Sequence, residues 1–195
     1  PHPGPARPPA PSGLGAIADK VFAGERLSGD DAVDLYRRAD LNALGALANW
    51  RREQLHADRT FFNVNQHLNY TNICNKLCRF CAFQRLPGQE GAYVFTPEQA
   101  AAKVRQYLDQ PVTEVHMVAG IDPKLPYSYY LDLVRAVKAA RPDIHVKAFT
   151  MVEIEQIAKV AKKPLDEVFA DLKAAGLGTL PGGGAEIFAE RVHRL

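Results

Sequence analysis

The chain of 195 residues lacks the features that mark membrane-spanning, secreted or nucleic-acid-binding proteins. No apolar stretch approaches the roughly 20 residues of a membrane span. The formal net charge is only +2 and no dense run of Lys or Arg is present, so charge indicates no nucleic-acid or membrane partner. Residues 1–13 are rich in Pro and Ala but have no apolar segment typical of secretory signals. We therefore expect a cytoplasmic protein that begins with a disordered leader over residues 1–13.

Cysteine is also scarce, and its few copies are concentrated in one place. The three cysteines, Cys74, Cys78 and Cys81, fall within eight residues. An odd number cannot be fully paired, and a reducing cytosol disfavours disulfides. One local disulfide with a spare thiol is the alternative, but the spacing favours a shared metal site.

Helix and strand patterns divide the remaining chain into two parts. Residues 14–58 predict two helical segments, the first broken at Gly24 and the second capped within residues 28–31, with Val33, Tyr36 and Leu41 among its charged residues. From residue 59 onward, strand and helix patterns alternate. We expect strands over residues 61–68, 114–118, 144–150 and 177–180, and helices that begin at Thr96 or cover residues 127–140 and 152–175, the last broken near Pro164.

This alternation is typical of an α/β protein with a parallel sheet or barrel. A closed barrel of eight strands needs about 250 residues, more than follow residue 59. An open sheet of four strands would leave an unpaired edge. The sequence therefore predicts a partial (β/α) TIM-like barrel over residues 59–195, preceded by short helices, with the C-terminal half of the barrel missing.

The predicted strands alternate apolar with polar residues, whereas parallel strands buried on both faces are nearly continuously apolar. Val115 and Met117 alternate with Glu114 and His116, and the strands at residues 61–68 and 144–150 follow the same rule. We interpret the polar set as the lining of a cavity inside the barrel, able to hold a large charged ligand. Strands with one solvated face are the alternative.

The spacing Cys74-x-x-x-Cys78-x-Phe80-Cys81 suits an iron–sulfur cluster. Cysteine thiolates are its usual ligands, and a cubane needs four to occupy every iron. Three leave one iron open to a substrate that carries an amine and a carboxylate, and Phe80 could shield the cluster from water. A zinc site is the alternative, but it needs a fourth ligand, and the nearest His, His67, lies seven residues before Cys74.

The loop and its surroundings resemble the radical S-adenosylmethionine (SAM) enzymes. The flanking residues resemble the subgroup that acts in futalosine-dependent menaquinone synthesis and in deazaflavin synthesis, and other segments resemble the menaquinone members. Among those, the likeness is greater to the aminofutalosine synthases than to the cyclases that act later. The likeness covers residues from Phe61 to the end, and its segments are Asn69–Cys74, Phe80–Phe83, Pro87–Tyr93, Glu114–Val118, His145–Thr150 and Leu180–Phe188.

The resemblance implies an enzyme with a 4Fe–4S cluster and SAM as co-substrate. It implies addition of the 5′-deoxyadenosyl radical to 3-[(1-carboxyvinyl)oxy]benzoate, giving aminofutalosine with loss of CO2 or bicarbonate. The expected partners are this small-molecule substrate and a one-electron donor such as flavodoxin or ferredoxin. The sister cyclase, and a module that holds a cluster without radical chemistry, are the rival hypotheses.

The resemblance also implies roles for particular residues. Cys74, Cys78 and Cys81 would ligate the cluster, with Phe80 beside it. Gly120 would meet the methionine amino group of SAM, although Ala119 stands where a second glycine is common. Asp122, near a position often acidic in relatives, would also contact the cofactor. Glu153 would bind the ribose, or would simply be a favourable carboxylate at a helix N-terminus.

Substrate contacts are expected from two further groups of residues. Gly182, Gly183 and Gly184 would let the backbone approach a ligand, with a plain turn as the alternative. His116, His145 and Lys147 could contact the two carboxylates of the substrate, although a single His or Lys is more often structural.

Overall fold

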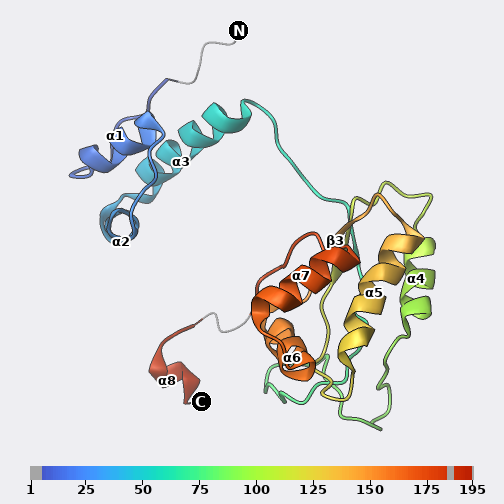
Figure 1. The fold of residues 1–195 in the computed structure, drawn as a ribbon. Coiled ribbons are helices and arrows are strands. Elements are labelled where there is room, and N and C mark those ends of the chain that lie inside the picture. Colours follow the sequence, from blue (N-terminus) through green and yellow to red (C-terminus); the bar gives the residue numbers. More distant parts are fainter. Residues whose placement is uncertain (1–5, 184–186, 195) are drawn as a thin grey trace. The chain divides into compact units, whose positions relative to one another are not determined.

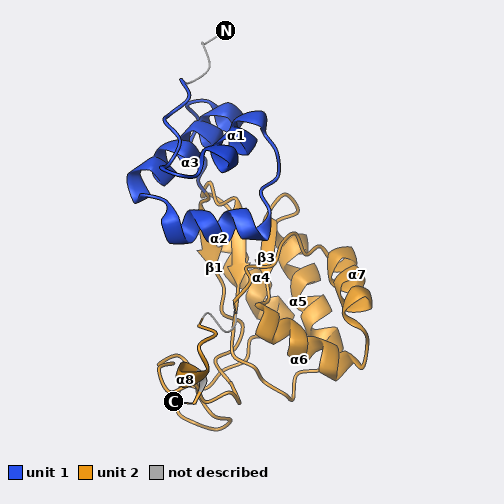
Figure 2. Ribbon diagram, turned by 90° about the vertical axis from the view of Figure 1, so that its left-hand side faces the viewer, with its two compact units in different colours: residues 1–62 blue, residues 63–195 orange. Residues whose placement is uncertain are grey.

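The computed structural model describes residues 6–183 and 187–194, and its chain forms two compact units, residues 1–62 and 63–195 (Figure 2). Among the described residues, no helix is both long and apolar enough to cross a membrane. Each unit has a hydrophobic cluster of its own.

Residues 6–62 of the first unit hold three helices, where the sequence predicted two: α1 (Gly15–Ala23), α2 (Gly29–Arg38) and α3 (Leu41–His56). The missed boundary lies at Asp40, whose carboxylate accepts hydrogen bonds from the backbone N–H groups of Asn42 and Ala43. Ala39 before it is extended, so the chain leaves α2 and a new helix begins. The prediction of one second helix was therefore wrong.

The apolar residues expected along that second helix do not form its buried face. Val33, Tyr36 and Leu41 are exposed, and Tyr36 retains 91% of its surface. The small core of the unit is built instead around Leu14, Ile17 and Leu35.

The second unit contains a parallel sheet with the order β1-β2-β3, formed by β1 (Asn65–His67), β2 (Glu114–Met117) and β3 (His145–Ala148). Its other elements are α4 (Pro97–Arg105), α5 (Tyr127–Ala140), α6 (Met151–Ala161), α7 (Leu165–Ala175) and the short α8 (Glu190–His193) (Figure 1). The expected strand over residues 177–180 is reduced to a single parallel bridge between Thr179 and Lys147.

Local signals placed the helices of this unit correctly. Thr96 and Gln99 form a reciprocal capping box at the start of α4. The helix predicted over residues 127–140 is α5, and Pro164 separates α6 from α7. Gly176 ends α7 in the left-handed conformation, which favours glycine.

The alternation of the strands separates two faces of the sheet. Val115, Met117, Val146 and Ala148 are buried in one core with residues of α4, α5, α6 and α7. The intervening polar residues lie on the opposite face, as the sequence predicted. Phe62 does not join the buried set, because it precedes β1 and is 82% exposed.

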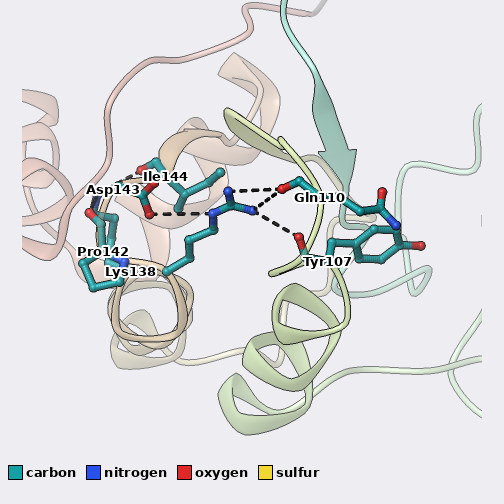
Figure 3. Close-up of polar contacts among 7 residues, drawn as sticks. Tyr107, Gln110, Lys138, Pro142, Asp143 and Ile144 are labelled. Carbon is teal, nitrogen blue, oxygen red and sulfur yellow. Dashed lines mark hydrogen bonds and ion pairs between the residues drawn. The ribbon is translucent and has the colours of Figure 1, made fainter.

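The end of the sheet where the strands begin is held by two cations (Figure 3). The guanidinium of Arg141 donates hydrogen bonds to the carbonyls of Tyr107 and Gln110, in the turn between α4 and β2. Lys138 donates to the carbonyls of Pro142 and Ile144, which lead into β3. These bonds bring charged donors to carbonyl groups of two turns, where Tyr107 and Gln110 also accept bonds from the N–H groups of Gln110 and Val112.

Replacing Arg141 with Ala should lower the free energy of unfolding by about 1–3 kcal/mol, because charge-assisted bonds to backbone carbonyls are lost. Denaturant unfolding followed by circular dichroism measures this change. Arg135→Ala is the matched control, since Arg135 pairs with Asp132 at the surface and bonds to no backbone carbonyl among the described residues. Equal losses in the two variants would contradict the proposed contribution of Arg141.

Candidate functional site

The cysteine loop leaves the end of β1 and is fixed at its base. The N–H of Arg85 donates to the carbonyl of Asn72, and the N–H of Cys74 donates back to the carbonyl of Arg85. The N–H of Asn75 donates to the carbonyl of Ile121, in the segment after β2. Backbone hydrogen bonds therefore join the two ends of the loop to each other and connect the loop to the segment after β2.

The three thiols lie at and beyond this base. Cys74 and Cys81 are half-buried, Cys78 is exposed, and all three are free, so the disulfide alternative is not found. The N–H of Cys81 donates to the carbonyl of Cys78, which folds the tip into a turn. Phe80, expected to shield the site, is 92% exposed, so its shielding role stays a prediction.

The donor set fits an iron–sulfur cluster in its chemistry. Three free thiols stand on one short loop, and thiolates are the usual cluster ligands. Among the described side chains, no three from Cys, His, Asp and Glu are gathered to hold one metal ion. This finding applies equally to a cluster and to zinc, so the choice of an iron–sulfur cluster rests on the number and spacing of the thiols.

Gly120 is required by a close approach between two segments. Its N–H donates to the carbonyl of Thr71, and a Cβ at this position would lie 2.2 Å from the carbonyl oxygen of Ile73. Ile73 directly precedes Cys74, so the absence of a side chain at Gly120 sets the path of the cysteine loop. The expected contact with the methionine of SAM stays a prediction.

Asp122 lies close to the same place. It is buried, and its Oδ1 accepts a hydrogen bond from the N–H of Lys124. With Cys74 and Asn75 it lines a cavity of about 70 Å³. Asp122 therefore lies near the cysteine loop, and its contact with SAM stays a prediction.

Glu153 is 2% exposed, and both oxygens of its carboxylate accept hydrogen bonds. Oε1 accepts from the hydroxyl of Tyr70 at 2.6 Å and from the N–H of Ala119 at 3.1 Å. Oε2 accepts from the N–H of Thr150 at 2.7 Å, as part of the capping box of α6. The sequence predicted that Glu153 either binds the ribose or is a carboxylate at a helix N-terminus. These contacts match the second role, and ribose binding stays an untested prediction.

Burial raises the pKa of Glu153, although hydrogen bonds from Tyr70, Thr150 and Ala119 oppose that effect. Burial and the Glu153 carboxylate raise the pKa of Tyr70, so its hydroxyl stays protonated and donates. No role was assigned to Tyr70 from the sequence. Its position shortly before Cys74 is the feature that could have indicated a part in positioning the cysteine loop.

The polar residues of the sheet fall into two rows. The register pairs His67 with His116 and His116 with Lys147, and it places Glu114 in the row with Asn65 and His145. Two predicted substrate residues, His116 and Lys147, are thus neighbours. The third, His145, lies in the other row, with its Nε2 2.8 Å from the Thr179 hydroxyl.

The row of His116 is electrostatically unusual. Burial, together with the charges of Lys147 and His67, lowers the pKa of His116 and so favours the neutral form of its ring. The Lys147 ammonium lies 3.8 Å from Oε1 of the buried Glu114. The rings of His67 and His116 meet edge to face, with centroids 5.3 Å apart.

The glycines after Leu180 form a turn beside α6. Gly182 and Gly183 have φ values of +83° and +85°, which favour glycine. The carbonyl of Gly182 accepts from the N–H of Met151, at the start of α6. A ligand contact at Gly182 and Gly183 stays a prediction, and Gly184 lies outside the described residues.

The sequence profile of the radical SAM superfamily matches residues 68–195, more than half of the chain. The chain belongs to the radical SAM superfamily. Members of this superfamily carry a 4Fe–4S cluster and use SAM, which confirms the predicted cofactors and the resemblance of the cysteine loop.

Two curated relatives have names from one pathway. The chain is 48% identical over 178 residues to aminodeoxyfutalosine synthase of Thermus thermophilus, covering 91% of this chain and 48% of that protein. It is 40% identical over 191 residues to cyclic dehypoxanthine futalosine synthase of Halalkalibacterium halodurans, covering 93% of this chain and 50% of that protein. The chain therefore spans about half the length of these relatives.

A solved structure supports the fold. The FeFe-hydrogenase maturase HydG from Carboxydothermus hydrogenoformans superposes with a TM-score of 0.54 at 19% identity, over 87% of this chain and 47% of that one. This likeness, with the parallel sheet and its helices, confirms the predicted α/β fold as part of a radical SAM barrel.

Replacing Gly120 with Ala should abolish or strongly reduce cluster binding, because the added Cβ would collide with the backbone of Ile73. Iron content and visible absorbance after anaerobic reconstitution measure the effect. Gly45→Ala is the control, since an added Cβ at that helical position meets no atom within 4 Å. Wild-type iron content in the Gly120 variant would contradict this account.

Replacing Tyr70 with Phe should destabilise the protein by about 1–3 kcal/mol, since one donor to a buried carboxylate is lost. The pKa of Glu153 should then rise further, so the loss should be largest at neutral pH and should shrink as the pH falls and Glu153 becomes protonated. Denaturant unfolding across pH measures this dependence. Tyr36→Phe, at an exposed ring, is the control, and a loss independent of pH would argue against a charge-assisted bond.

Proposed function

We propose that the protein is an aminofutalosine synthase of menaquinone biosynthesis. In this reaction the 5′-deoxyadenosyl radical adds to the enol-ether double bond of 3-[(1-carboxyvinyl)oxy]benzoate. The aryl group then migrates, and the carboxylate leaves as CO2 or bicarbonate with release of the one electron that SAM cleavage took up, giving 6-amino-6-deoxyfutalosine. The observation that carries the proposal is the 48% identity to the Thermus thermophilus synthase over 91% of the chain, cysteine loop included.

When bound, the reduced cluster supplies the electron that divides SAM into methionine and the 5′-deoxyadenosyl radical. The residues of the chain then have distinct tasks. Cys74, Cys78 and Cys81 would hold the cluster through their thiolates. Gly120 lets the segment after β2 approach the loop, and Glu153 fixes that segment through the N–H of Ala119.

The polar face of the sheet offers the substrate hydrogen-bonding groups, in agreement with a ligand that carries two carboxylates. The apolar face packs against the helices and excludes water from the other side of the strands. Exclusion of water and of other hydrogen donors protects a radical intermediate from quenching.

The reaction needs one electron for each cleavage of SAM, so we propose a soluble donor such as flavodoxin or ferredoxin. We also place the protein in the cytoplasm, whose reducing conditions would keep the three thiols available for the cluster.

The second candidate is cyclic dehypoxanthine futalosine synthase, favoured by the 40% identity to the Halalkalibacterium halodurans enzyme. That identity is lower than the 48% to the synthase, which is why we prefer the synthase. A module that binds a cluster without radical chemistry is the third possibility.

Anaerobic reconstitution followed by SAM, a strong reductant and the enolpyruvyl benzoate should yield aminofutalosine, detected by mass spectrometry. Ala at Cys74, Cys78 or Cys81 should abolish SAM cleavage, because each thiolate is a cluster ligand. Formation of 5′-deoxyadenosine only with a dehypoxanthine-futalosine substrate would identify the cyclase instead. Absence of any SAM cleavage in the iron-loaded wild type would support the module, and an active single variant would overturn the cluster assignment.

A further inference from the structure

Three basic side chains from three different strands stand next to one another on the polar face of the sheet. His67 is the last residue of β1, and His116 and Lys147 are each one residue from the end of β2 and β3. The parallel register aligns them in one row. Because the cysteine loop and the Gly120 segment leave these same strand ends, the row lies at the edge of the sheet where the predicted chemistry takes place.

Two buried side-chain atoms on this face have no hydrogen-bond partner among the described residues, Nε2 of His116 and Oε1 of Glu114. Buried polar atoms in folded proteins are nearly always hydrogen-bonded, so Nε2 of His116 indicates a missing partner, whereas Oε1 of Glu114 is an acceptor that faces the Lys147 ammonium. Lys147 is close enough to Glu114 for an ion pair, but 3.8 Å is too long for a hydrogen bond. The ammonium of Lys147 therefore lies near the Glu114 carboxylate, and its N–H groups remain able to donate hydrogen bonds to a ligand.

The neighbouring row contributes one of these two atoms, Oε1 of Glu114, but its histidine differs from His116. Nε2 of His145 has a partner in the hydroxyl of Thr179, and the side chain is exposed. Of these two histidines, His116 is therefore the one whose ring nitrogen has no partner among the described residues. His67 also lines a cavity of about 370 Å³ beside β1, with Asn65 and residues of α4 and the turn after it, and neither His116 nor Lys147 is among the residues that line this cavity.

The donors of this row match one kind of ligand group. A Lys ammonium and the N–H groups of imidazole rings all donate, and a carboxylate accepts from several donors at once. Glu114 would neutralise Lys147 while the site is empty and would orient its ammonium. The aromatic ring of a benzoate could in turn lie against the imidazole rings.

We propose that His67, His116 and Lys147 form one subsite that binds a carboxylate of the aromatic substrate, with Glu114 as the residue that positions Lys147. This inference rests on the proposed function. It adds His67 to the residues predicted from the sequence and leaves His145 out, because the Nε2 atom of His145 is already engaged with Thr179.

The test uses the reconstituted protein and compares His67→Ala, His116→Ala and Lys147→Met with the wild type. Each variant should raise the KM for the enolpyruvyl benzoate at least about tenfold, since each loses a bond to a charged group. The KM for SAM should stay within about twofold, because the row would contact only the other substrate. Lys147→Arg should recover part of the loss, and Lys159→Met, at an exposed lysine of α6, should behave as the wild type.

Calorimetric binding of benzene-1,3-dicarboxylate to the same proteins separates this inference from the proposed function. A wild type that cleaves SAM but makes no aminofutalosine would overturn the proposed function. Loss of dicarboxylate binding in the three variants would still support the subsite. Binding that is undetectable in the wild type, or is unchanged in the variants, would overturn the subsite, as would variants that raise both KM values equally.

Discussion

The buried carboxylate of Glu153 joins the ends of all three strands. Tyr70 follows β1, Ala119 follows β2 and Thr150 follows β3, and each donates a hydrogen bond to this one group. Burying a carboxylate is unfavourable unless its oxygens are fully bonded, and three donors from three segments meet that requirement only when the strand ends are correctly placed. The geometry of the cysteine loop depends on this arrangement, because Tyr70 begins the path to Cys74 and Ala119 precedes Gly120.

The two ends of the sheet consequently have different tasks. At the beginning of the strands, Arg141 and Lys138 satisfy backbone carbonyls, and their bonds lie within the fold. At the other end, backbone bonds attach the base of the cysteine loop to the segment after β2, and Cys78 and Phe80 are left exposed. Such a division is expected of barrels, in which the carboxyl ends of the strands carry the chemistry and the opposite ends contribute stability.

The sequence predicted the features that depend on short stretches of chain. Proline, glycine and capping residues act through their nearest neighbours, so the bounds of α5 and the start of α4 could be predicted. The cysteine spacing likewise identifies a superfamily from one loop. The helix boundary at Asp40 was missed because Asp40 was not recognised as a cap between two apolar stretches, although its bonds to Asn42 and Ala43 are local.

Features that depend on distant segments could not be predicted. A carboxylate three residues after Thr150 indicates a capping box, but nothing near Glu153 in sequence shows that Tyr70 and Ala119 also donate to it. Likewise, β-strand alternation identifies the polar residues, whereas only the register shows that Lys147 is level with His116 and His145 is not. The chemistry of the row follows from this register, because a shift of one residue would turn Lys147 toward the helices and bury its charge without Glu114. The parallel pairing of β2 with β3 therefore determines both the stability of the sheet and the set of donors on its polar face.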